Sequence, residues 1–168
     1  MMLHDIEKWI DEVNREHESQ RTCCVHLYAH LRGFYPKAFL EQAFYVVVEE
    51  LPRPQFLAGQ SAVIDNFLSQ PLDGITYKNT YYLLPDMAKN LNIHFHELVH
   101  VAQWRTLGAA GFITRYMAEL AQHGYRNAPL EVIAYGLEDY FIKNGTQLNV
   151  LQQVEFDLKR QHKIEQHH

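Results

Sequence analysis

Two histidines four positions apart, with a glutamate directly after the first, constrain this chain more than any other feature. His96, Glu97 and His100 lie in an otherwise mostly apolar run from Asn92 to Trp104. On a helix, residues four apart lie on one face, so the two imidazoles would point the same way. This spacing suits two nitrogen ligands on one zinc ion, with Glu97 placed to hold a metal-bound water.

The apolar flanks of this motif predict that its helix is buried. A helix with apolar residues on most sides belongs in a core, where two imidazoles and a carboxylate are costly unless a partner satisfies them. A metal ion would be such a partner. We therefore predict a metal site rather than a surface helix with scattered polar side chains. The apolar residues around the motif are Phe95, Leu98, Val99, Val101 and Ala102.

Length and composition predict one globular domain over residues 1–168. The chain is long enough for its own core, and 47% of its residues are hydrophobic. We place the metal-binding core at about 44–143, N-terminal helices at 5–32 and a C-terminal helix at about 146–162.

Charge and cysteine content restrict the classes of binding partner and the cellular compartment that we expect. The formal net charge is -5 with no block of like charges, which argues against a nucleic-acid partner. The N-terminus is charged and the chain has no long apolar stretch, so we expect no signal peptide and no membrane partner. The only cysteines, Cys23 and Cys24, are adjacent. Neighbouring cysteines rarely bridge, which fits a reducing, cytoplasmic location. The oligomeric state stays open.

The patterning predicts an α+β fold, mostly helical, with a short mixed sheet next to the metal-site helix. Residues 43–48 and 75–84 are rich in β-branched and aromatic residues, so we predict a buried strand and a second strand there. The second strand is either an ordinary member of the sheet or an edge that pairs with an extended peptide. Helices are expected at about 5–20, 112–123 and 129–143, besides the metal-site helix.

Helix ends can also be predicted from single residues. We expect Asp86 to cap the start of the metal-site helix and Gly108 to end it. Asn127 is the expected cap of the helix that starts at Pro129, and Thr146 is the expected cap of the last helix. The last residues, 161–168, should be frayed, with solvated histidines.

A catalytic zinc ion takes three protein ligands and leaves the fourth position to water. No histidine follows His100 at short spacing, although His123 remains a candidate, so Glu119 and Glu131 compete for the third place. We favour Glu131, because the first turn of a helix fixes a carboxylate and its dipole favours negative charge. Glu119 faces away from the apolar stripe of its own helix, as a solvated residue would.

The remaining polar residues have less definite roles. The donor that stabilises a reacting oxyanion should be one of Tyr125, Arg126, His123 and Tyr135, and we name Tyr125 and Tyr135 as candidates beside the base Glu97. Gln103 and Trp104 lie one turn past His100 and should pack beside the site or support it.

A second histidine pair, His26 and His30, has the same spacing but no neighbouring carboxylate. We interpret it as structural or surface histidines.

The motif from His96 to His100 resembles that of the zincin metallopeptidases, and a glutamate third ligand on a second helix is similar to their gluzincin branch. The segment from Gly74 to Tyr77 before the helix, and the segment from Pro129 to Tyr135 after it, also resemble small bacterial zincin-like proteins. The resemblance covers roughly residues 44–140. It implies that His96, His100 and Glu131 bind Zn²⁺ and that Glu97 is the catalytic base. The large substrate-binding subdomain of big gluzincins has no counterpart here.

The expected function is therefore that of a zinc metallopeptidase. A zinc-bound water would attack a peptide bond of a peptide or protein substrate, and Glu97 would move the proton to the leaving amine. The alternative is a zinc-binding interaction module on the same scaffold without catalysis. A metal-free helical scaffold, in which hydrogen bonds alone satisfy the histidines, is the third hypothesis.

Overall fold

Segments with helical periodicity form helices, and the aromatic-rich segments form a small sheet. The computed structural model describes residues 2–166, and the side chains of residues 2–161. The fold is α+β and mostly helical, as the sequence predicts. The strands are β1 (Thr22–Cys23), β2 (Phe44–Val47), β3 (Gly74–Tyr77) and β4 (Thr80–Leu83). The α-helices are α1 (Met2–Glu16), α2 (Tyr28–Leu31), α3 (Lys37–Glu41), α4 (Ala62–Ser69), α5 (Leu91–His123), α6 (Pro129–Ile142) and α7 (Val150–Gln166).

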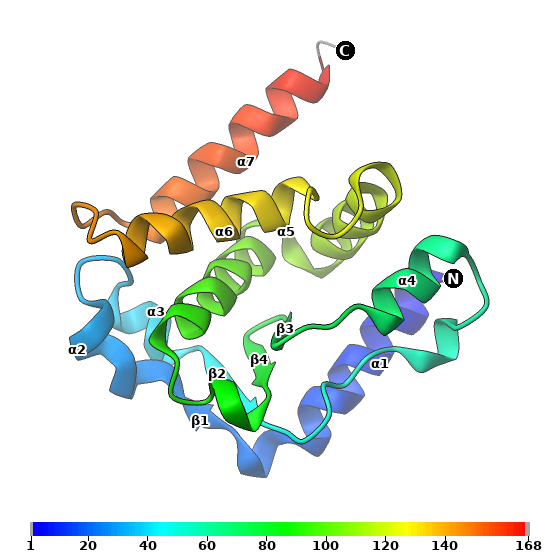
Figure 1. Ribbon diagram of the computed structural model, residues 1–168, viewed down its shortest axis with the longest axis horizontal. Helices are drawn as coiled ribbons and strands as arrows, with labels where there is room; N and C mark the ends of the chain where they lie inside the picture. Colours follow the sequence, from blue (N-terminus) through cyan, green and yellow to red (C-terminus); the bar gives the residue numbers. More distant parts are fainter. Residues whose placement is uncertain (1, 167–168) are drawn as a thin grey trace.

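The four strands form one mixed sheet in the order β1-β2-β4-β3 (Figure 1). β4 pairs in parallel with β2 and antiparallel with β3, and β1 pairs antiparallel with β2. β3 is therefore an edge strand.

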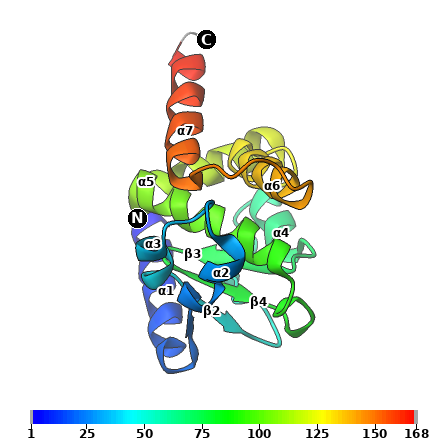
Figure 2. The ribbon, with the colours of Figure 1, turned by 90° about the vertical axis from the view of Figure 1, so that its left-hand side faces the viewer.

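Helices α5 and α1 cover opposite faces of this sheet (Figures 1 and 2). Successive side chains of a strand point to opposite faces. On β4, the Tyr81 hydroxyl lies 2.6 Å from Nδ1 of His94 in α5, whereas the Tyr82 hydroxyl donates to Asn14 in α1 at 2.7 Å. Both tyrosines are fully buried. The sheet thus holds α5, which carries the metal-site motif, at a fixed position.

The single strand predicted at 75–84 is wrong, because this stretch is a hairpin. Tyr77 pairs with Thr80, and Lys78 adopts a positive φ of 61° in the two-residue turn between them. Such turns usually carry glycine or Asn-Gly, so Lys-Asn gave no turn signal. The Lys78 ammonium contacts Glu7 at 2.9 Å and Asp11 at 2.7 Å, both in α1. These long-range ion pairs accompany a turn that local sequence did not predict.

Two further strand and helix predictions need correction. The strand predicted at 43–48 forms as β2, but it is not fully buried, since Val47 is 44% exposed. The region 5–32 is not only helical, because β1 pairs with β2 there.

Helix α5 starts later than predicted, and its first segment ends at Gly108 as predicted, with a second segment running on to His123. Its cap is Asn90, whose side chain accepts a hydrogen bond from the Asn92 amide at 3.0 Å. Asp86 lies instead in a short 3₁₀ turn, Pro85–Met87. Gly108 interrupts the helix with a φ of 72°, as a glycine can, and helical backbone resumes at once.

The predicted caps of the last two helices are also wrong. Helix α6 has Ala128 at its cap position, with no side-chain cap from Asn127. Helix α7 starts at Val150, and the Asn149 side chain, not that of Thr146, accepts from the Gln152 amide at 3.1 Å. The histidines predicted to be solvated at 167–168 lie outside the described residues. Within residues 2–166, no helix combines the length and apolar character required to cross a bilayer.

Candidate metal centre

Three side-chain atoms from two helices converge in the core. His96 and His100 lie on adjacent turns of α5, and Glu131 lies in the first turn of α6. The two Nε2 atoms are 3.2 Å apart, and Oε1 of Glu131 lies 3.2 Å from that of His96 and 3.0 Å from that of His100. All three residues are buried, with at most 5% exposure. A buried group of this kind could hold a metal ion.

The hydrogen bonds of the Nδ1 atoms of His96 and His100 determine which ring nitrogen of each carries the proton when the ring is neutral. Nδ1 of His96 lies 2.8 Å from the Glu138 carboxylate, and Nδ1 of His100 lies 2.8 Å from Oε1 of Gln103. Gln103 is oriented by its own amide nitrogen, which donates to the Leu130 carbonyl. Both Nδ1 atoms therefore carry the proton in the neutral rings, and both Nε2 lone pairs point toward the Glu131 carboxylate.

Three acceptor atoms this close together need a proton or a cation between them. Burial favours the neutral ring of His96, but its hydrogen bonds to Glu131 and Glu138 outweigh burial and raise its pKa well above the usual value. Burial by itself raises the pKa of the Glu131 carboxyl. The two imidazoles outweigh burial and hold this pKa well below its usual value. The site thus attracts positive charge.

The donor set and its spacing fit zinc. Two imidazoles and one carboxylate are a common protein ligand set for catalytic zinc, with the fourth position left open. Bond lengths of about 2.0–2.1 Å in a tetrahedron place neighbouring ligand atoms about 3.3 Å apart. The three distances of 3.0–3.2 Å come close to this value without any rearrangement of the helices.

Glu97 points from the same helix toward the edge strand. Its Oε2 accepts a hydrogen bond from the Thr76 hydroxyl at 2.8 Å, and the side chain lines a cavity that also contains His100 and Glu131. Burial raises the pKa of Glu97, although the two imidazoles and the Thr76 hydrogen bond act in the opposite direction. A carboxylate with a raised pKa is a stronger base than an exposed one.

Gly74 on β3 leaves room for the Glu97 carboxylate. A Cβ atom at Gly74 would lie 2.8 Å from Oε1 of Glu97 and 2.9 Å from Cδ2 of Leu83. We expect Gly74→Ala to lower the free energy of unfolding by about 1–3 kcal/mol through overpacking. Chemical denaturation would measure it. The matched control is Gly136→Ala in α6, where a Cβ meets nothing within 4 Å, and this change should be neutral or stabilising. Equal stability of the two variants would contradict the close packing at Glu97.

Glu119 is not a ligand of this site, and it is not solvated as predicted. It is 5% exposed, and its carboxylate accepts hydrogen bonds from the Leu130 amide at 2.8 Å and from Nε of Arg115 at 2.9 Å. The amide belongs to the first turn of α6, next to Glu131. Glu119 therefore satisfies the start of the helix that presents Glu131. The prediction failed because this partner comes from another helix.

Two residues that touch the site were not assigned a role from the sequence. The Tyr116 hydroxyl donates to Oε2 of Glu131 at 2.7 Å, and Glu138 accepts from His96. Glu138 shares a helix stripe with Glu131, which was a usable signal, since carboxylates often orient metal-ligating imidazoles. Tyr116 gave no such signal, because its aromatic ring matched the apolar stripe of its own helix segment.

Removing the Glu138 carboxylate should weaken metal binding without unfolding the protein. We expect Glu138→Ala to raise the zinc dissociation constant by about 10–100-fold, because the His96 ring loses the group that orients it. Competition with a chelator would measure this constant. Asp139→Ala is the matched control, since Asp139 is exposed and pairs with Lys143 on the surface. A Glu138→Ala protein with wild-type zinc affinity would show that the contact does not support the site.

The four predicted oxyanion donors differ in their contacts with the site and with the cavity beside it. The hydroxyls of Tyr125 and Tyr135 are 3.2 Å apart, and the Tyr135 ring packs on the His96 ring at 4.4 Å between centroids. Tyr125 lines the cavity beside the site. Arg126 stacks over Tyr135, and His123 is exposed at the end of α5. Tyr125 is the one of the four that lines the cavity.

The other predicted residues occupy supporting or separate positions. Gln103 links His100 to the α6 backbone, and Trp104 stacks on Phe112 in the core. His26 and His30 are both exposed, and His26 lies 3.0 Å from the Tyr45 hydroxyl, so that pair belongs to the surface. No family model, curated protein or solved structure matches this chain.

Proposed function

We propose that this protein is a zinc-dependent hydrolase of the metallopeptidase type. His96, His100 and Glu131 would hold Zn²⁺, and Glu97 would act as general base. The observation that supports this most strongly is the convergence of two Nε2 atoms and one carboxylate oxygen within 3.2 Å of one another in the core.

A bound zinc ion would supply a water of lowered pKa and polarise a substrate carbonyl. The chain's own groups would do the rest. The Glu97 carboxylate, held by Thr76, would accept the proton of the attacking water and pass it to the leaving nitrogen. The Tyr125 hydroxyl is the candidate donor to the developing oxyanion.

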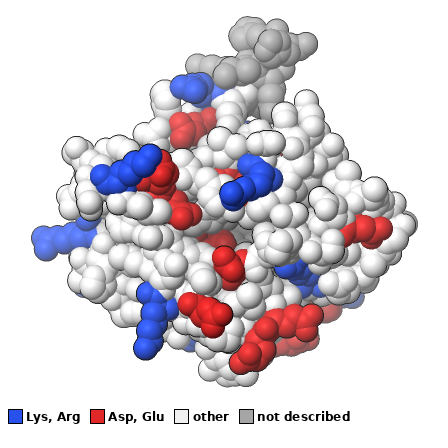
Figure 3. Space-filling view, in the orientation of Figure 1, with Lys and Arg blue, Asp and Glu red and all other residues white. Residues whose placement is uncertain are grey.

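The surface fits a peptide-like substrate better than nucleic acid. On the face shown in Figure 3, the basic side chains of the described residues stand singly, and acidic ones lie near the centre and in a larger patch toward the lower right. A nucleic-acid surface would carry a basic stripe. A neutral amide avoids repulsion by these carboxylates.

Hydrolysis of a mixed library of peptides and N-acylated peptides by the zinc-loaded protein tests this proposal. We expect cleavage that a chelator abolishes and added zinc restores. If one equivalent of zinc binds and no amide is hydrolysed, the activity proposed here is wrong, and a non-catalytic zinc module fits better.

A further inference from the structure

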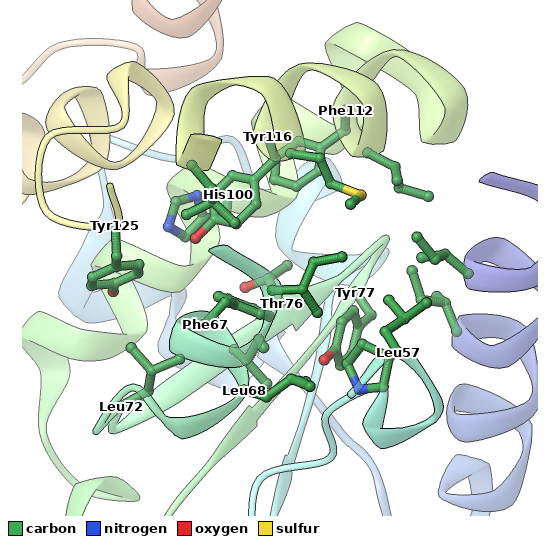
Figure 4. A pocket seen from close by; sticks show the side chains of 18 of the residues that line it. Leu57, Phe67, Leu68, Leu72, Thr76, Tyr77, His100, Phe112, Tyr116 and Tyr125 are labelled. Carbon is green, nitrogen blue, oxygen red and sulfur yellow. The ribbon is translucent and has the colours of Figure 1, made fainter. Parts of the chain in front are cut away.

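An apolar cavity leads away from the candidate metal centre. It has a volume of about 110 Å³ and contains Glu97, His100 and Glu131 at one end. Figure 4 shows His100, Tyr116 and Tyr125 near one end and Leu57 and Tyr77 toward the other. Helices α1 and α4 and the second segment of α5 supply most of the remaining wall. Representative lining residues are Ile6, Trp9, Ile64, Phe67, Ile113 and Met117.

The cavity follows the edge strand along its whole length. All four residues of β3 line it, from Gly74 beside the Glu97 carboxylate to Tyr77, whose ring meets Trp9 of α1 at 5.3 Å. Three steps along a strand span about 10 Å. A guest that fills this length must be slender and extended, and a short branched side chain would leave much of it empty.

The wall offers polar chemistry at one end only. Among the described lining residues, the charged side chains are Glu97 and Glu131, which lie next to His100. Farther from this end than Thr76, the lining side chains are apolar or aromatic. At about 110 Å³ the cavity is smaller than the dry apolar cavity of about 150 Å³ that is known to accept benzene, so it has room for a few methylene groups of a slender chain. The cavity therefore matches a molecule with a reactive carbonyl at the end of a hydrocarbon chain.

We propose that the substrate is an amide whose acyl group is an unbranched aliphatic chain. The chain lies along β3, and the scissile carbonyl lies at Glu97, His100 and Glu131. This inference rests on the proposed hydrolase function. The reaction adds water across the C–N bond: the acyl carbon takes the hydroxyl, the nitrogen takes the proton, and nothing is oxidised or reduced.

Helix α4 provides a site for a selective change. None of its residues is fully buried, and Val63 lines the cavity. Val63→Phe should fill the cavity without touching the metal ligands. Ala62→Phe is the matched control, because Ala62 is exposed on the same helix and does not line this cavity.

Binding of alkyl hydroxamates, which chelate zinc, tests the inference without requiring turnover. We would titrate the zinc-loaded protein with acetohydroxamate, butanohydroxamate, octanohydroxamate and benzohydroxamate by calorimetry. Each buried methylene can strengthen binding by about three- to fourfold, so octanohydroxamate should bind at least about 100-fold tighter than acetohydroxamate. Val63→Phe should remove most of this gain and leave acetohydroxamate unchanged, whereas Ala62→Phe should keep the gain.

Affinity that does not rise with chain length, or benzohydroxamate binding tighter than octanohydroxamate, would overturn the inference while the hydrolase proposal stands. If acetohydroxamate binds no better to zinc-treated than to metal-free protein, the metal site fails instead. Binding of octanol, which has no chelating group, then tests the cavity independently of the metal. It should bind metal-free wild type and not Val63→Phe, and failure to bind wild type would overturn the inference.

Discussion

Glu97→Gln is expected to keep one zinc ion per chain while lowering amide hydrolysis by about 10²–10⁴-fold, the usual contribution of a general base. Glutamine has nearly the same shape and can still accept the hydrogen bond from Thr76, but it cannot take a proton from water. The measurements are kcat/KM on a responsive substrate and metal content of the same sample. Glu155→Gln, on the surface of α7, is the matched control. Unchanged hydrolysis by Glu97→Gln would exclude Glu97 as the base.

Glu131→Ala is expected to remove the metal site. Losing a carboxylate that only orients a ligand costs about 10–100-fold in metal affinity, and losing a ligand itself should cost more than about 100-fold. Zinc should therefore raise the unfolding temperature of the wild type and leave that of Glu131→Ala unchanged. Val132→Ala is the control, since Val132 is the next residue of α6 and is 51% exposed. Equal zinc affinities of wild type and Glu131→Ala would contradict the assignment of the third ligand.

The metal-site helix and the fold class could be predicted because both depend on short-range patterns. The spacing of His96 and His100 within an apolar run is set by the helical period, and the structure places both rings on one buried face of α5. Glu131 could be favoured over Glu119 because it opens a helix after Pro129. The mostly helical α+β architecture is confirmed.

The supporting contacts could not be predicted because their partners are far apart in the sequence. Helical periodicity places Tyr116 on the apolar stripe of its helix segment and Glu119 off it, but it does not indicate which polar group either side chain meets. The packing of α6 against the second segment of α5 brings the Tyr116 hydroxyl to the Glu131 carboxylate. The same packing brings the Glu119 carboxylate to the Leu130 amide.

The turn at Lys78 could not be predicted from the sequence for a related reason. The positive φ of Lys78 is accompanied by ion pairs with Glu7 and Asp11 of α1, which are far from it in the sequence, and the local residues are not typical of a tight turn.

The metal content of protein purified without added histidines tests the central claim most directly. Elemental analysis of wild type and His96→Ala, expressed and purified in parallel, would count the ions. We expect close to one zinc per chain in the wild type and almost none in the variant. Wild-type protein that stays metal-free after incubation with zinc would contradict the claim that these two imidazoles and the Glu131 carboxylate form a metal centre.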